Sequence, residues 1–124
     1  MKLCHITLSV KNLETSLRFY QEITGLTLQR RFPAGPGMEI AFLADGETEV
    51  ELICGGAPHE GAALGQGVSL GFVSPSLDDT IALLREKSYE TDGVIERPNP
   101  HVSYFFTRDP DGYRVQFVQG GMDP

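Results

Sequence analysis

The sequence predicts an α+β fold made of two βαβββ modules in succession. The first observation is a weak internal repeat: the segment from His5 to Leu17 resembles the segment from Ser69 to Ile81, and each is typical of a strand, a polar break and a helix. The second is that strand-like runs separated by Gly, Pro and Asp follow each predicted helix. Chance similarity between two amphipathic βα units is the alternative explanation of the repeat.

We expect one domain over residues 1–124, with module one at about 1–54, a glycine-rich linker at about 55–66 and module two at about 67–119. The strands expected after the helices lie at 26–32, 38–43 and 49–54 in the first module and at 93–97, 101–107 and 113–119 in the second.

Each predicted helix follows a residue that is typical of an N-cap. Asn12 and Ser76 have short side chains that can accept a hydrogen bond from an early backbone N–H group. Apolar residues then repeat at helical spacing from Leu13 and from Leu77. Gly25 is a plausible end of the first helix, whereas the end of the second is not marked.

Side chains of a strand alternate between the two faces of a sheet, and this alternation separates apolar from polar residues. Under that rule the apolar side chains lie beneath the helices, and the opposite face carries His5, Thr7, Glu51, Ser69 and Gln116. Such a face is too polar for a packed core and too sparsely charged for an ordinary solvated surface. We therefore expect the sheets to curve around a polar cleft.

Composition excludes several classes of function. The 124 residues include 17 acidic and 10 basic side chains, for a formal net charge of −7, so a nucleic acid backbone would be repelled. The apolar runs are far shorter than the roughly 20 residues of a membrane helix, and the N-terminal segment turns polar too early for a signal peptide. Cys4 and Cys54 suit a reduced, cytoplasmic protein and should pack under the helices as small hydrophobes.

Three segments of the sequence together carry a family resemblance. They are the opening strand from His5 to Val10, the Ser-Leu-Arg-Phe-Tyr run at 16–20, and the Asp-Pro-Asp-Gly run at 109–112. With these segments the chain resembles the vicinal oxygen chelate superfamily, the group of glyoxalase I, bleomycin-resistance proteins and extradiol dioxygenases, over about residues 2–119. The resemblance implies the glyoxalase-like fold, a small-molecule substrate and a homodimer.

The resemblance also implies a metal site with one residue from each of four strands, and these positions fall on His5, Glu51, Ser69 and Gln116. Glyoxalase-like members usually have His at the third position and Glu at the fourth. This chain has a poor ligand in Ser69 and a neutral amide in Gln116, so we expect His5, Glu51 and Gln116 to hold a divalent ion such as Ni, Co, Zn or Mn less tightly.

Glu51 is the expected catalytic residue, because a glutamate in a glyoxalase-type cleft moves a proton between neighbouring carbons. The ordinary alternative is that Glu51 is one of several solvated acids on an edge strand. His5 has a similar alternative, as a strand histidine that is hydrogen-bonded to a neighbour.

The expected substrate-binding residues are Ser69, His101, Arg114 and Phe106. Ser69 would form part of the pocket wall, and Arg114 would pair with an anionic group because it shares a face with Gln116. His101 would open the seventh strand and could replace the missing imidazole, although a surface loop histidine is the slightly simpler interpretation. Phe106 would line the pocket or pack in the core.

These observations favour a glyoxalase I-like enzyme that acts on a small 2-oxo compound or thiol conjugate. The alternative is a metal-free protein of the bleomycin-resistance type, which would use the same cleft to sequester a small molecule. A weaker alternative is an iron-dependent extradiol dioxygenase, for which His101 would have to supply a second imidazole.

Overall fold

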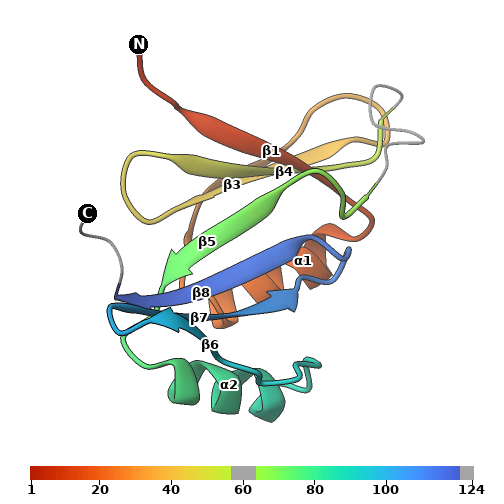
Figure 1. The fold of residues 1–124 in the computed structure, drawn as a ribbon. Coiled ribbons are helices and arrows are strands. Elements are labelled where there is room, and N and C mark those ends of the chain that lie inside the picture. The colour runs from red at the N-terminus through yellow and green to blue at the C-terminus, as the bar shows by residue number, and fades with distance from the viewer. Residues whose placement is uncertain (57–63, 121–124) are drawn as a thin grey trace. The chain divides into compact units, whose positions relative to one another are not determined.

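A strand, a helix and three further strands follow one another twice along the chain (Figure 1). The structure is a computed structural model that describes residues 1–56 and 64–120, so residues 57–63 of the predicted linker lie outside the described residues. The chain divides into two compact units, Met1–Leu64 and Gly65–Pro124. The element order confirms the predicted α+β class and its two βαβββ modules.

The first unit contains β1 (His5–Val10), α1 (Leu13–Glu22), β2 (Thr27–Pro33), β3 (Glu39–Ala44) and β4 (Glu49–Cys54). The second unit contains β5 (Ser69–Val73), α2 (Leu77–Glu86), β6 (Glu96–Asn99), β7 (Val102–Arg108) and β8 (Arg114–Gly120). No helix among the described residues has the length and apolar character needed to cross a membrane.

Both units contain a four-stranded sheet with the same topology. The strand orders are β1-β4-β3-β2 and β5-β8-β7-β6, in which the first pair of each sheet is parallel and the other pairs are antiparallel. Thr7 is paired with Glu51 in the first sheet, and Gly71 is paired with Gln116 in the second. Glu51 and Gln116 therefore occupy equivalent places, and so do His5 and Ser69.

The helices begin where the caps predict. The Asn12 side chain accepts a hydrogen bond from the Thr15 N–H group at 3.0 Å, and the Ser76 hydroxyl accepts one from Asp79 N–H at 3.2 Å. After α1 the chain turns through Gly25, whose φ of +76° is a left-handed conformation that glycine adopts without a steric penalty.

Each unit buries its core between its own helix and sheet. Helix α1 contacts β3 and β4, and helix α2 contacts β8. The largest fully buried side chains are Leu8, Phe19, Tyr20, Leu43 and Leu52 in the first unit and Leu84, Phe105 and Val115 in the second. Because the strand residues of this set face the helices, the other face of each sheet remains available for polar groups.

The prediction for the sixth strand was wrong. Strand β6 begins at Glu96 rather than at residue 93, because the Thr91 and Asp92 side chains accept hydrogen bonds from the N–H groups of Gly93 and Val94 and hold this stretch in turns. The expected start of the seventh strand also shifts by one residue. His101 lies in the turn before β7, where its N–H group donates to the Asn99 side chain at 2.8 Å.

The prediction for Cys4 was also wrong. Cys4 is exposed and precedes β1, so it does not pack beneath a helix, whereas Cys54 is half-buried. Burial along β1 decreases toward its start: Leu8 and Val10 are buried, Ile6 is half-buried, and Cys4 lies beyond the covered part of the strand.

The Asp-Pro-Asp-Gly run forms the turn between β7 and β8. Asp109 is buried, and one oxygen of its carboxylate accepts hydrogen bonds from the N–H groups of Asp111 and Tyr113, each at 2.9 Å. Gly112 completes the turn at a φ of +92°. The run therefore sets the pairing that brings Phe106 opposite Gln116.

We expect Asp109→Ala to lower the free energy of unfolding by about 1–3 kcal/mol, because two backbone N–H groups lose their acceptor in a buried turn. Urea denaturation would measure the change. Asp45→Ala, at an exposed acid in another turn, is the matched control and should change stability by less than about 0.5 kcal/mol. Equal effects of the two substitutions would contradict the structural role of Asp109.

Candidate functional site

Three side chains of β1 and β4 meet on the face of the first sheet opposite α1. His5 Nε2 lies 3.6 Å from Glu51 Oε1, and the Thr7 hydroxyl donates a hydrogen bond to the same oxygen at 2.5 Å. The Glu51 side chain is 12% exposed and that of His5 is 41% exposed. The structure thus brings together two of the predicted site residues, with Glu51 as the better shielded of the two.

The imidazole of His5 has neighbours on more than one side. Cys4 Sγ lies 3.4 Å from His5 Nδ1, and the ring meets Phe42 edge-on, with 5.8 Å between the ring centroids. These contacts orient the ring so that its other nitrogen faces Glu51. A fixed ring orientation is what a ligating or hydrogen-bonding histidine requires.

A second polar group lies next to this pair on the same sheet face. The guanidinium of Arg30 lies 4.0 Å above the centre of the Phe42 ring and makes two hydrogen bonds to the Glu49 carboxylate, at 2.8 and 2.9 Å. These hydrogen bonds hold the pKa of Glu49 below its ordinary value and raise the pKa of Arg30. Both groups are therefore charged and already paired at neutral pH.

The equivalent face of the second sheet carries neutral groups at the two ligand positions. Ser69 is exposed at the start of β5, and Gln116 is half-buried in the middle of β8. The amide oxygen of Gln116 reaches over Gly71, since a Cβ atom added to that glycine would lie 3.6 Å from it. The second sheet thus offers neutral oxygen atoms where the first offers an imidazole and a carboxylate.

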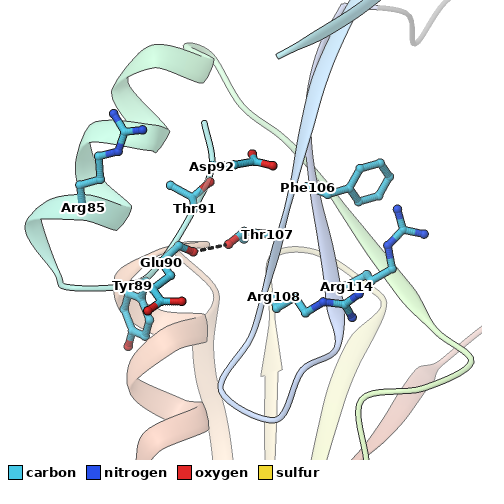
Figure 2. Close-up of a pocket in the computed structure, with 9 residues that line it drawn as sticks. All are labelled: Arg85, Tyr89, Glu90, Thr91, Asp92, Phe106, Thr107, Arg108 and Arg114. Atoms are coloured by element: carbon cyan, nitrogen blue, oxygen red, sulfur yellow. Dashed lines mark hydrogen bonds between the residues drawn. The ribbon is translucent and has the colours of Figure 1, made fainter. Parts of the chain in front are cut away.

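Arg114 and Phe106 also lie together on this second face. The guanidinium of Arg114 is 4.0 Å above the centre of the Phe106 ring. Both residues line a cavity of about 800 Å³ beside β7 (Figure 2). None of His5, Glu51, Ser69 or Gln116 lines this cavity, so it adjoins the predicted ligand position of the second unit without containing it.

His101 is the predicted site residue that lies apart from the others of its unit. It is exposed in the turn between β6 and β7, and its carbonyl packs against Gly120 at the end of β8. Gly120 lies four positions beyond Gln116 along the same strand. The position of His101 within the second unit therefore does not bring it beside Gln116.

The donor atoms allow a test of whether a divalent ion fits. Two ligands bound at about 2.0–2.2 Å to one ion can be at most about 4.4 Å apart, and the 3.6 Å between His5 Nε2 and Glu51 Oε1 meets this condition. Within residues 1–56 and 64–120 there is no group of three or more His, Cys, Asp or Glu side chains arranged to hold a metal. His5 and Glu51 therefore meet the distance condition for two ligands of one ion.

Sequence reasoning identified Thr7 as a member of the polar face but missed its hydrogen bond to Glu51. It missed the Arg30–Glu49 pair entirely, because β2 is paired with β3 through a bulge between Leu28 and Arg30 that shifts the alternation of side chains. Strand alternation puts Thr7 and Glu51 on one face, and the parallel register of β1 with β4 is what makes them direct neighbours.

The fold and the sequence together establish the family. Residues 2–117 match the profile of the Glyoxalase/Bleomycin resistance protein/Dioxygenase superfamily, and the chain belongs to this superfamily. A lactoylglutathione lyase of Neisseria meningitidis is 30% identical over 96% of this chain and 91% of its own length. The chain therefore has a glyoxalase I-like relative that it matches over nearly the whole length of both proteins.

Solved structures show the same fold. A glyoxalase family protein from Bacillus cereus matches with a TM-score of 0.78 and 18% identity, over 97% of this chain and 94% of the other. TnmS3, an antibiotic binding protein from Streptomyces sp. CB03234, matches with a TM-score of 0.74 and 22% identity, over 98% and 97% of the two chains. These likenesses confirm the predicted glyoxalase-like fold.

The Arg30–Glu49 pair predicts a defined pH dependence of stability. The folded state lowers the pKa of Glu49 from its ordinary value of 4.5, so the pair stabilises the protein above that pH and the contribution is lost as the pH falls through the lowered pKa. Glu49→Gln should therefore lower the free energy of unfolding at neutral pH. The difference in this free energy between the variant and the wild type should become smaller in acid.

Urea denaturation at neutral pH and at about pH 3 would measure this difference. Glu47→Gln is the matched control, because the Glu47 carboxylate pairs with Lys2 at an exposed position and such pairs contribute little. If Glu49→Gln lowers the free energy of unfolding by the same amount at both pH values, the role assigned to this ion pair is contradicted.

Proposed function

We propose that this protein is a glyoxalase I-like enzyme that moves a proton between neighbouring carbon atoms of a small 2-oxo compound or thiol conjugate. The observation that carries the proposal is the shielded Glu51 carboxylate, which is held through one oxygen by Thr7 and His5. The match to lactoylglutathione lyases supports the same class of reaction.

Glu51 is the residue that moves the proton. Its contacts with Thr7 and His5 both use Oε1, which leaves Oε2 for a substrate C–H group. The carboxylate takes the proton from the carbon that bears the hydroxyl and returns it to the former carbonyl carbon, while the hydroxyl proton passes to the other oxygen, so that the carbonyl and hydroxyl groups exchange places. Atoms and electrons balance within the substrate, so the reaction needs no oxidant or reductant.

His5, Glu51 and Gln116 are the residues that would hold a divalent ion such as Ni, Co, Zn or Mn. When bound, such an ion supplies a Lewis acid that stabilises negative charge on neighbouring substrate oxygens. In this part of the proposal His5 is the anchor, because its ring is already oriented by Cys4 and Phe42. Ser69 has no ligand role in this proposal and is kept as a substrate-contacting residue, although it does not line the cavity beside β7.

The second candidate is a metal-free protein that binds and sequesters a small molecule. Two observations favour it: the neutral residues Ser69 and Gln116 at the second pair of ligand positions, and the likeness to a structure described as an antibiotic binding protein. The extradiol dioxygenase alternative stays the weakest, because the second imidazole it needs would come from His101 in the β6–β7 turn.

The remaining expectations belong to the proposal as well. We infer a cytoplasmic homodimer with a small-molecule substrate. The net charge of −7 argues against a nucleic acid partner, and the family resemblance supports the dimer.

The proposal predicts that Glu51→Gln lowers the turnover number by about a hundredfold or more, because the amide cannot accept the substrate proton. The substrate would be the hemithioacetal of methylglyoxal and glutathione, assayed by absorbance after addition of Ni, Co, Zn or Mn. Glu49→Gln is the matched control, since it lies two residues away on the same sheet face but is already paired with Arg30.

Unchanged turnover in Glu51→Gln would remove this residue from the reaction. Loss of turnover to the same degree in both variants would indicate a general disturbance of the sheet. A wild-type protein that binds the hemithioacetal but shows no turnover with any of these metals would contradict the enzyme and support the second candidate.

A further inference from the structure

The two sheets carry a phenylalanine at equivalent places, and an arginine is stacked on each ring, from β2 in the first sheet and from β8 in the second. Arg30 lies 4.0 Å above the Phe42 ring in the first sheet, and Arg114 lies 4.0 Å above the Phe106 ring in the second. Phe42 is paired with Glu51, and Phe106 is paired with Gln116, so the two aromatic rings occupy equivalent positions.

The two arginines differ in their acidic partners. Arg30 makes two hydrogen bonds to Glu49, so the first sheet supplies a carboxylate for its own stacked guanidinium. In the second sheet the position equivalent to Glu49 is Arg114 itself, because Ser69 is paired with Arg114 as His5 is paired with Glu49. No acidic side chain among the described residues forms an ion pair with Arg114.

We infer that Arg114 binds the carboxylate of a small organic anion, in the way that Arg30 binds Glu49. The Phe106 ring holds the guanidinium flat, so its planar fork is oriented before a ligand arrives. Arginine binds carboxylates through two parallel hydrogen bonds, which is the arrangement already present between Arg30 and Glu49.

The cavity beside Phe106 gives the rest of such a ligand a place to lie. Figure 2 shows Arg114 and Phe106 on one side of the hollow and the loop with Glu90 and Asp92 across from them. A second arginine, Arg108, also lines the cavity but donates a hydrogen bond to the Gly112 carbonyl at 2.7 Å. Arg114 is therefore the better placed cation for an incoming anion.

The charges across the cavity limit the class of ligand. The lining carries three arginines, Arg85, Arg108 and Arg114, against two carboxylates, Glu90 and Asp92, so its charge suits a ligand with one carboxylate and a neutral body. A 2-oxo acid with an apolar body satisfies this description. The inference rests on the proposed function in one respect: both assume that the substrate binds on the face of the second sheet that carries Gln116 and Arg114.

Phenylpyruvate and its uncharged methyl ester are suitable probes, because they differ only in the carboxylate. Binding of each would be measured by isothermal titration calorimetry at low ionic strength, on metal-free protein, where no turnover is required. We expect the wild type to bind the acid about tenfold more tightly than the ester, as a charge-assisted pair allows. Arg114→Gln should abolish this preference, and Arg114→Lys should restore part of it.

Arg30→Gln is the matched control, since its guanidinium is stacked in the same way but is already paired with Glu49. It should keep the tenfold preference, and thermal unfolding would confirm that each variant is folded. Equal binding of acid and ester by the wild type, binding of neither, or an equal loss in both variants would overturn the inference. Because the assay involves no turnover, its failure is distinct from failure of the proposed enzyme.

Discussion

The parallel pairing of β1 with β4 is the constraint on which the candidate site depends. It sets Thr7 directly beside Glu51 and brings the His5 imidazole to 3.6 Å from the Glu51 carboxylate, although these residues are far apart along the chain. Parallel strands need a crossover, and α1 with β2 and β3 supplies it. A shift of one residue in this register would turn the side chains of one strand to the opposite face, so His5 and Glu51 would no longer share a face and the helix-facing core would lose the apolar residues of that strand.

The second unit repeats this pairing with different chemistry. Ser69 replaces His5, Gln116 replaces Glu51 and Arg114 replaces Glu49 at equivalent register positions. The first sheet therefore carries an imidazole and carboxylates at these positions, whereas the second carries neutral hydrogen-bonding groups and a cation. The backbone pairing tolerates these exchanges because side chains on this face do not fill the core beneath the helix. One repeated backbone arrangement thus carries two different sets of polar side chains.

Local signals predicted most of the fold, because they act over a few residues. Asn12 and Ser76 were recognised as caps, and the strand at 49–54 was predicted with its observed bounds. The strand after α2 was misplaced, because the side chains of Thr91 and Asp92 bind nearby backbone groups in a way that periodicity does not reveal. Pairings such as Arg30 with Glu49 depend on a bulge and on side-chain rotamers, so the alternation rule could place Glu51 but could not find its neighbours.

The most direct measurement of the central claim is the nitrogen resonance of the His5 side chain during addition of one equivalent of Zn²⁺ to ¹⁵N-labelled protein. If His5 and Glu51 form the metal-binding half of the site, the His5 Nε2 resonance should shift to a metal-bound position, and Glu51→Gln should weaken the effect. The exposed His101 serves as an internal reference and should keep its resonance. An unchanged His5 signal at saturating Zn²⁺ would contradict the assignment of this pair as a metal site.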